Sequence, residues 1–242
     1  MIKEAIDKIL ELAKIETFAK GDRSYAKQKL VEITPPGFVS PEVLTLNTLS
    51  GMVDYLQSLD EEMQQKVFLQ VNDFNSVSLL GLLQPENSNK RFTYARSQLA
   101  VSQFNFSQPT QPAWYDLENF VIALQSQFVQ TNKIDELISH LSHLANETVV
   151  DVKDDSFSQS YQIKTGITTK SQVVVTNPIT LRPHRTFSEI EQPASTCIFR
   201  LKSKGGMQCA LFISDGGAWK LDAINNIKNW LKEQLPDITI IA

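Results

Sequence analysis

The sequence predicts an α+β protein, with mainly antiparallel sheets and helices packed on one face. Many segments that alternate apolar and polar residues follow one another across short turns, as antiparallel strands do. Stretches of helical periodicity stand before these runs of strands, and a further one closes the chain. A length of 242 residues, with 42% hydrophobic and 21% charged residues, is ordinary for a globular protein.

Residues 1–40 are expected to form an N-terminal helix and an extended arm. Apolar residues recur at helical spacing from residue 2 to residue 20, and Gly21 and Asp22 end the pattern. A short strand is predicted over 24–33, before a segment with three prolines and a glycine.

Residues 41–130 are predicted to form a first α+β unit. Its helices are expected over 47–59, capped by Asn47 or Thr48, and over 116–129, capped by Asp116. The remaining elements are strands, predicted at 42–46, 66–73, 76–83 and 90–99.

Residues 131–242 are predicted to form a second α+β unit with the C-terminal helix. Its helices are expected over 133–145 and from Trp219 to Leu235, where Pro236 stops the helix. Strands are predicted at 147–154, 156–166, 171–181, 185–193, 195–203 and 207–215. A helix followed by three strands occurs in both units, which gives a pseudo-repeat without detectable sequence identity.

The two cysteines are expected to be free thiols. They lie on two strands of a predicted hairpin centred on residues 204–206. That register would pair Cys197 with a residue near Ile213 and Cys209 with one near Leu201, so the sulfurs would not meet.

Charge and motifs exclude several classes of protein. The net charge of −4 gives no bulk attraction to DNA, although it leaves room for a basic patch. We find no signal peptide and no apolar run long enough to cross a membrane, and therefore expect a cytosolic protein. Nucleophile elbow, P-loop and dinucleotide motifs are missing from the sequence, so we expect no catalytic residue and no cofactor, and we favour a non-enzymatic role over an enzymatic one.

The densest polar cluster, "RPHRTFSEIEQP", allows three interpretations. Arg182, His184 and Arg185, together with Trp219, could bind an anion. Glu189 and Glu191 would point the same way along a strand and could hold a metal, as in metal-dependent nucleases. The third interpretation is a turn after Pro183 followed by an exposed strand face.

Two further patterns have structural interpretations. "SDGGAWK" predicts a strand-to-helix turn that Asp215 closes, with Trp219 anchoring the helix on the sheet. Glu136, His140 and His143 share one helix face and could hold a metal, but a solvated face has the same pattern.

A basic and aromatic strand is the candidate site for nucleic acid. Phe92, Tyr94 and Arg96 would share one face of a strand that also carries Lys90 and Arg91. Aromatic rings beside cations can stack on single-stranded bases. A core face with charged ends is the alternative.

Over roughly residues 43–235 the chain resembles uncharacterised proteins of tailed phages and prophages of low-GC Gram-positive bacteria, and more distantly YfdQ-like prophage proteins. The resemblance lies in "IALQSQF", "KTG", "RPHRTFSEIEQP" and "DGGAWK". It implies an early-region phage protein in the cytoplasm of the bacterial host, encoded near recombination or replication functions, and it assigns no catalytic residues.

These observations leave three hypotheses for function. The first, which the resemblance implies, is a non-enzymatic oligomeric phage protein that supports DNA replication or recombination. In a sharper version it is a clamp-like ring with a basic inner helix face, since the repeated helix-plus-three-strands pattern is similar to the unit of DNA sliding clamps. The second is a counter-defence protein that binds a host immune protein or sequesters a nucleotide signal. The third is a metal-dependent nuclease. A homo-oligomer is expected because exposed sheet edges are often covered by another subunit.

Overall fold

The structure, a computed structural model, divides the chain into two compact units, Met1–Pro41 and Glu42–Ala242. The division lies next to the predicted boundary at residue 40. The residues that the structure describes are 3, 17–20, 23–26, 42–84, 87–100, 103–145, 150–154, 159–165, 168–175, 177–203 and 206–242.

In the first unit the described residues form a hairpin of β1 (Thr17–Lys20) and β2 (Arg23–Ala26), with Phe18 opposite Tyr25. The prediction of helix as far as residue 20 is therefore wrong for residues 17–20. Thr and Phe favour strands. Apart from Lys3, the rest of the predicted helix lies outside the described residues.

The second unit contains a five-stranded sheet, called here the first sheet, with the strand order β14-β4-β5-β6-β3. The central strands are antiparallel, and the two edge strands run parallel to their neighbours. Its strands are β3 (Leu44–Leu46), β4 (Phe68–Asp73), β5 (Ser76–Gln84), β6 (Asn87–Gln98) and β14 (Ile240–Ile241).

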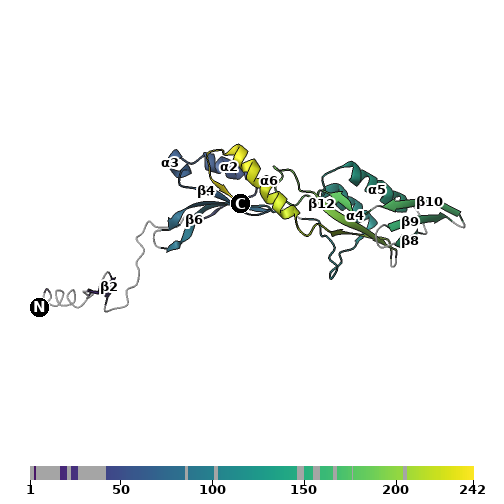
Figure 1. The fold of residues 1–242 in the computed structure, drawn as a ribbon, viewed down its shortest axis with the longest axis horizontal. Coiled ribbons are helices and arrows are strands. Elements are labelled where there is room, and N and C mark those ends of the chain that lie inside the picture. The colour runs from purple at the N-terminus through teal and green to yellow at the C-terminus, as the bar shows by residue number, and fades with distance from the viewer. Residues whose placement is uncertain are drawn as a thin grey trace. The chain divides into compact units, whose positions relative to one another are not determined.

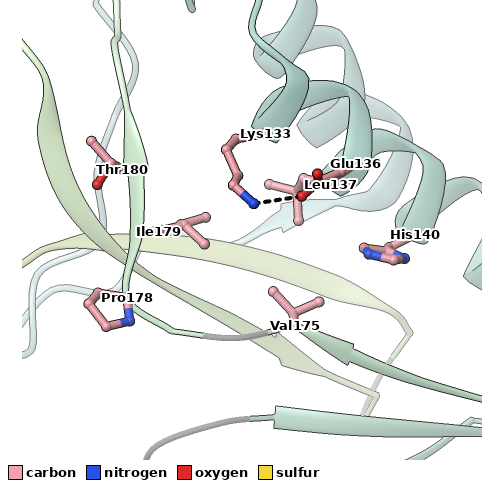
Figure 2. Close-up of a pocket in the computed structure, with 8 residues that line it drawn as sticks. All are labelled: Lys133, Glu136, Leu137, His140, Val175, Pro178, Ile179 and Thr180. Carbon is pink, nitrogen blue, oxygen red and sulfur yellow. Dashed lines mark hydrogen bonds and ion pairs between the residues drawn. The ribbon is translucent and has the colours of Figure 1, made fainter.

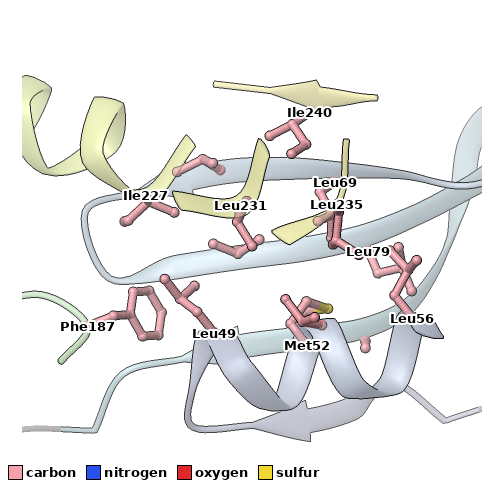
Figure 3. Packing of buried hydrophobic residues seen from close by; sticks show 14 of the residues in the cluster. Leu49, Met52, Leu56, Leu69, Leu79, Phe187, Ile227, Leu231, Leu235 and Ile240 are labelled. Carbon is pink, nitrogen blue, oxygen red and sulfur yellow. The ribbon is translucent and has the colours of Figure 1, made fainter. Parts of the chain in front are cut away.

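Helices α2 (Leu49–Gln57) and α6 (Trp219–Gln234) pack on the first sheet, and the short α3 (Glu61–Gln64) follows α2 (Figure 1). The Thr48 side chain caps α2 by accepting a 3.0 Å hydrogen bond from the Gly51 amide, as predicted. Figure 3 shows the core that results, in which Met52 of α2 and Leu231 of α6 meet Leu69 and Leu79 of the sheet. Phe187, from a distant loop, completes this core.

The second sheet has the order β11-β12-β13-β7 and is wholly antiparallel. Two helices, α4 and α5, contribute to the same core as this sheet. Asp116 caps α4, since its side chain accepts a 2.9 Å hydrogen bond from the Asn119 amide. The elements are β7 (Tyr115–Asp116), α4 (Leu117–Ser126), α5 (Asn132–Ala145), β11 (Ile179–Leu181), β12 (Ser195–Lys202) and β13 (Gln208–Ile213).

The predicted register of the β12–β13 hairpin is confirmed. Cys197 lies opposite Ile213, Cys209 lies opposite Leu201, and both thiols are free and buried. Burial raises the pKa of each thiol to about 12, so both stay protonated at neutral pH. These cysteines are packing residues of the second core.

A third sheet, of order β10-β9-β8, stands between α5 and β11 in the sequence. Its strands are β8 (Val150–Asp154), β9 (Gln159–Thr165) and β10 (Thr168–Val175). The single strand predicted over 171–181 is instead divided into β10 and β11, and the cis peptide bond of Asn177–Pro178 lies between them. The predicted α+β class, with mainly antiparallel sheets, is confirmed.

The two larger sheets share one pattern of connections. In each, a strand and a helix come before three further strands, which gives the orders β4-β5-β6-β3 and β11-β12-β13-β7. The first strand of each set therefore pairs with the last. The predicted second copy, a helix plus strands 147–181, corresponds to α5 and the consecutive strands β8, β9 and β10. Among the described residues this sheet has no strand that corresponds to β3 or β7.

The core contacts cross the predicted boundary between residues 130 and 131. Ile227 and Leu231 of α6, and Phe187, are buried with α2 and β4 rather than with the second sheet. The C-terminal helix was assigned to the second unit because it follows that unit in sequence. Its apolar face packs on the first sheet.

Candidate functional site

The candidate site is built on the loop between β11 and β12, residues 182–194. The loop was predicted to contain a strand at 185–193, but it is a non-regular segment with a turn at Ser188–Ile190. The buried Gln192 side chain accepts hydrogen bonds from the amides of Arg185 (3.0 Å) and Thr186 (3.2 Å). It also donates to the Phe187 carbonyl at 2.9 Å. One side chain therefore satisfies backbone groups of residues 185–187 that strand pairing would otherwise have satisfied.

The loop connects both cores of the second unit. On one side, backbone hydrogen bonds of 2.8 Å join Val129 to Arg182 and His184 to Gln127, beside α4. On the other side, the Thr186 hydroxyl donates to the Phe74 carbonyl in the β4–β5 turn, and Phe187 enters the first core. Residues 183–187 therefore have fixed positions between the two sheets.

Arg185 is the charged side chain that this loop buries, with 2% of its surface exposed. Its Nη2 donates to the Ser195 hydroxyl at 2.6 Å and to the Pro193 carbonyl at 3.3 Å. Nε and Nη1 are also buried, and they have no hydrogen-bond partner. Among the described residues no carboxylate lies within ion-pair distance of this guanidinium.

Electrostatics leave Arg185 charged despite this burial. Burial lowers the pKa of Arg185 to about 10, while the negative charge of Asp215 acts in the opposite direction. The side chain is therefore cationic at neutral pH. Asp215 acts through Ser195, whose hydroxyl donates to Asp215 Oδ2 and accepts from the arginine.

Trp219 covers one face of the guanidinium, with its ring centroid 3.7 Å from Arg185 Cζ. The predicted "SDGGAWK" turn places it there: Asp215 Oδ1 accepts from the Gly217 amide at 2.9 Å, and Gly216 and Gly217 have φ values of 63° and 87°. Left-handed backbone of this kind favours glycine. Phe74 packs edge-on against Trp219, with centroids 4.8 Å apart.

Arg185 and Trp219 line one side of a cavity of about 220 Å³. The segment before β7 also lines it, with the buried Phe104 and the half-buried Phe106. Polar side chains stand around it, and Gln103 donates to the Arg185 carbonyl at 3.3 Å. The cavity thus combines a buried cation, aromatic rings and amide side chains.

The structure separates the four predicted anion-binding residues into two groups. Arg185 and Trp219 share this cavity, whereas Arg182 and His184 line another, of about 300 Å³, beside Val129 and Glu191. Arg182 forms an ion pair with Glu191, and His184 is exposed. The four residues therefore do not form one site.

Glu189 and Glu191 do not converge, contrary to the strand geometry on which the nuclease hypothesis depended. Glu189 Oε1 accepts hydrogen bonds from the Ser50 amide (3.0 Å) and hydroxyl (3.2 Å) at the start of α2. Glu191 pairs with Arg182 instead. Within the described residues, no group of three His, Cys, Asp or Glu side chains is placed to hold a metal.

The basic and aromatic residues of β6 are partly engaged inside the protein. Phe92 and Tyr94 stack with centroids 6.2 Å apart, and Tyr94 packs against Gly81 and the first core. Arg91 donates to the Gly81 carbonyl at 3.2 Å and lies over Phe68. Lys90 and Arg96 are exposed. The strand thus has the predicted core-facing role and keeps two cations in solvent.

A second cavity, of about 350 Å³, lies between α5 and the segment that leads into β11 (Figure 2). Lys133 and Glu136 form a 2.9 Å ion pair at its edge, and His140 stands one turn further along the helix. The His143 side chain lies outside the described residues. Because Lys133 already neutralises Glu136, this wall resembles a solvated helix face more than a ligand set.

Sequence reasoning missed Ser195, Asp215, Gln103 and the two phenylalanines as parts of the Arg185 site. They come from separate segments that only the tertiary fold brings together. The "SDGGAWK" motif contained a usable signal, because it placed Asp215 and Trp219 on one turn.

Comparison with known proteins adds no identification: no family model matches the chain, and no curated protein or solved structure does so either. Among the described residues, no helix has the length and apolar character that spanning a bilayer requires.

Proposed function

We propose that this protein works by binding a ligand, without catalysing a reaction, and that the ligand presents an anionic group to Arg185. The observation that carries the proposal is the pair of buried donors, Nε and Nη1, that have no acceptor. A buried donor without a partner costs about 1–3 kcal/mol, and more when it is charged. A bound anion supplies the missing acceptors and the counter-charge.

The cavity beside Arg185 determines what kind of ligand fits. Its volume of about 220 Å³ is below the range of about 300–1,000 Å³ typical of drug-sized ligands, so it accepts a small group or one end of a larger molecule. Protein atoms cover both nitrogens at present. Binding therefore requires a shift of the guanidinium or of the side chains beside it.

This proposal develops the hypothesis of a protein that sequesters a nucleotide signal, because the ligand is bound without being chemically changed. Ser195 accepts a hydrogen bond from Arg185 and donates one to Asp215, and Trp219 covers one face of the guanidinium. These contacts keep the arginine beside the cavity, and its two remaining donors become accessible after the shift described above. A host immune protein as the partner, and the host cytoplasm as the location, remain predictions.

Calorimetric titration with inorganic phosphate and acetate tests the proposal. We expect the wild-type protein to bind phosphate and Arg185→Gln to bind about 10- to 100-fold more weakly, since charge-assisted hydrogen bonds contribute about 1.5–3 kcal/mol. Arg182→Gln is the matched control and should bind like the wild type, because Arg182 lines a different cavity.

A thermal shift of the wild-type protein on adding phosphate keeps the test valid if Arg185→Gln does not fold. No binding by the wild type, or equal losses in the two variants, would overturn the proposal.

A second candidate, an oligomeric accessory protein of phage DNA replication or recombination, is favoured by the shared strand order of the two larger sheets. The two sheets share this order alone, because β3 runs parallel to β6 whereas β7 runs antiparallel to β13. The edge strand β3 leaves Leu44 42% exposed beside Val43 at 44%, which suits contact between subunits. Neither α2 nor α4 contains Lys or Arg, so a ring with a basic helical lining is not part of this candidate.

Gel shifts with single-stranded DNA at about 50 mM and about 200 mM salt, together with native mass spectrometry, test the second candidate. We expect an oligomer whose DNA binding weakens steeply with salt and with Arg96→Ala, which removes an exposed cation of β6. Lys133→Ala removes a charge elsewhere and should have no effect. A monomer that shifts no DNA at low salt rejects this candidate.

A further inference from the structure

The walls of the Arg185 cavity specify more than an anion. Three aromatic side chains line it, and they differ in exposure: Phe104 is 5% exposed, Trp219 is 7% exposed, and Phe106 is half-buried. Arg185 already occupies a face of Trp219, and Phe104 is surrounded by other rings of the second core. Phe106 is therefore the ring best able to contact a ligand.

Phe106 is held in place by its neighbours. Its ring centroid lies 4.8 Å from that of Phe104, in an edge-on arrangement, and 6.2 Å from that of Phe128. Both of these rings belong to the second core, so Phe106 needs little further ordering when a ligand binds. A fixed aromatic wall favours a flat ring in the ligand, since offset or edge-on aromatic contacts contribute beyond simple burial.

Amide side chains also line the same cavity. Gln103, Asn105 and Gln108 are all exposed and line it. Gln103 Nε2 donates to the Arg185 carbonyl, which leaves its Oε1 and one further N–H available. Amide groups that both donate and accept match the edge of a nucleobase.

We infer that the ligand of this cavity is a nucleotide or the terminal nucleotide of a single strand, with its phosphate at Arg185 and its base against Phe106. The inference rests on the proposed anion-binding function and adds the chemical class of the ligand. The volume of about 220 Å³ holds part of one nucleotide, and not a duplex, so the rest of the nucleotide lies outside the cavity.

Titration calorimetry of the full chain with four probes tests the inference: inorganic phosphate, ribose 5-phosphate, a nucleoside monophosphate, and a short oligonucleotide with a terminal phosphate. We expect the nucleotide to bind more tightly than ribose 5-phosphate. Phe106→Leu should remove that advantage, about 5- to 150-fold, because stacking of a base on an aromatic side chain contributes about 1–3 kcal/mol. Phosphate binding should be unchanged by Phe106→Leu.

Phe92→Leu is the matched control, because it removes an aromatic ring of β6 that does not line the cavity. Tighter binding of the oligonucleotide than of the mononucleotide would assign the site to a strand end, and the reverse would assign it to a free nucleotide.

Arg185-dependent phosphate binding without any preference for the nucleotide would overturn this inference and leave the proposed function standing. Absence of phosphate binding would remove both.

Discussion

At the scale of single residues, Glu189 was a candidate metal ligand in the sequence, but its carboxylate binds the N-terminus of α2 in the structure. Helix α2 has no acidic residue in its first turn, and Glu189 reaches its N-terminus from 139 positions away in the sequence. A negative charge stabilises a helix at that end. Burial alone would raise the pKa of Glu189. Hydrogen bonds from Ser50 and from other backbone amides lower the pKa by more than burial raises it, so the net change is downward.

Glu189→Ala should lower the free energy of unfolding by about 1 kcal/mol, the usual cost of removing a helix-capping acceptor. Because the pKa of Glu189 is lower in the folded state, its contribution is fully present above the unfolded pKa of about 4.3 and is lost as pH falls through the folded pKa. Urea unfolding at pH 7 and below pH 4 would show the cost of the substitution shrinking in acid.

Glu191→Ala is the comparison for that experiment. It removes an exposed ion pair with Arg182, and such pairs contribute about 0–1 kcal/mol. A difference between Glu189→Ala and the wild type that does not change with pH would contradict the capping role.

At the scale of elements, α6 belongs to the first sheet although it follows the second. Its buried face contains Ala223, Ile227 and Leu231, and Leu235 and Ile240 continue the same apolar surface beyond it. The 182–194 loop also contacts this helix, because the Asn226 side chain donates a 3.1 Å hydrogen bond to the backbone carbonyl of Glu191. The helix therefore joins the core of one sheet to the loop that holds Arg185.

Leu231→Ala should destabilise the protein by about 2–5 kcal/mol, since the leucine is fully buried and its removal leaves a cavity. Hydrogen exchange should show the loss of protection in β4 and β5, which share its core. Lys232→Ala, on the exposed side of the same helix, should change stability by no more than about 0.5 kcal/mol. Loss of protection confined to β12 and β13 would show that α6 packs on the second sheet, contrary to the structure.

At the scale of the whole molecule, the sequence predicted single helices and strands better than it predicted which of them pack together. Caps at Thr48 and Asp116 and the register of Cys197 were readable because each depends on residues close in sequence. The packing of α6 on the first sheet and the burial of Arg185 could not be predicted from the sequence, because they depend on contacts between distant segments. Of the four predicted anion-binding residues, Arg185 and Trp219 share one cavity and Arg182 and His184 share another, and Phe106 had no local signal.

The parallel edge strand β14 and helix α6 also have a consequence for biosynthesis. On the ribosome, β4, β5 and β6 are translated long before the residues that cover them, since Ile227, Leu231 and Ile240 come from the end of the chain. A nascent polypeptide therefore carries a partly uncovered apolar sheet face until these residues have left the ribosome, a state that attracts chaperones and favours aggregation. A product of premature termination would keep that face exposed throughout its lifetime.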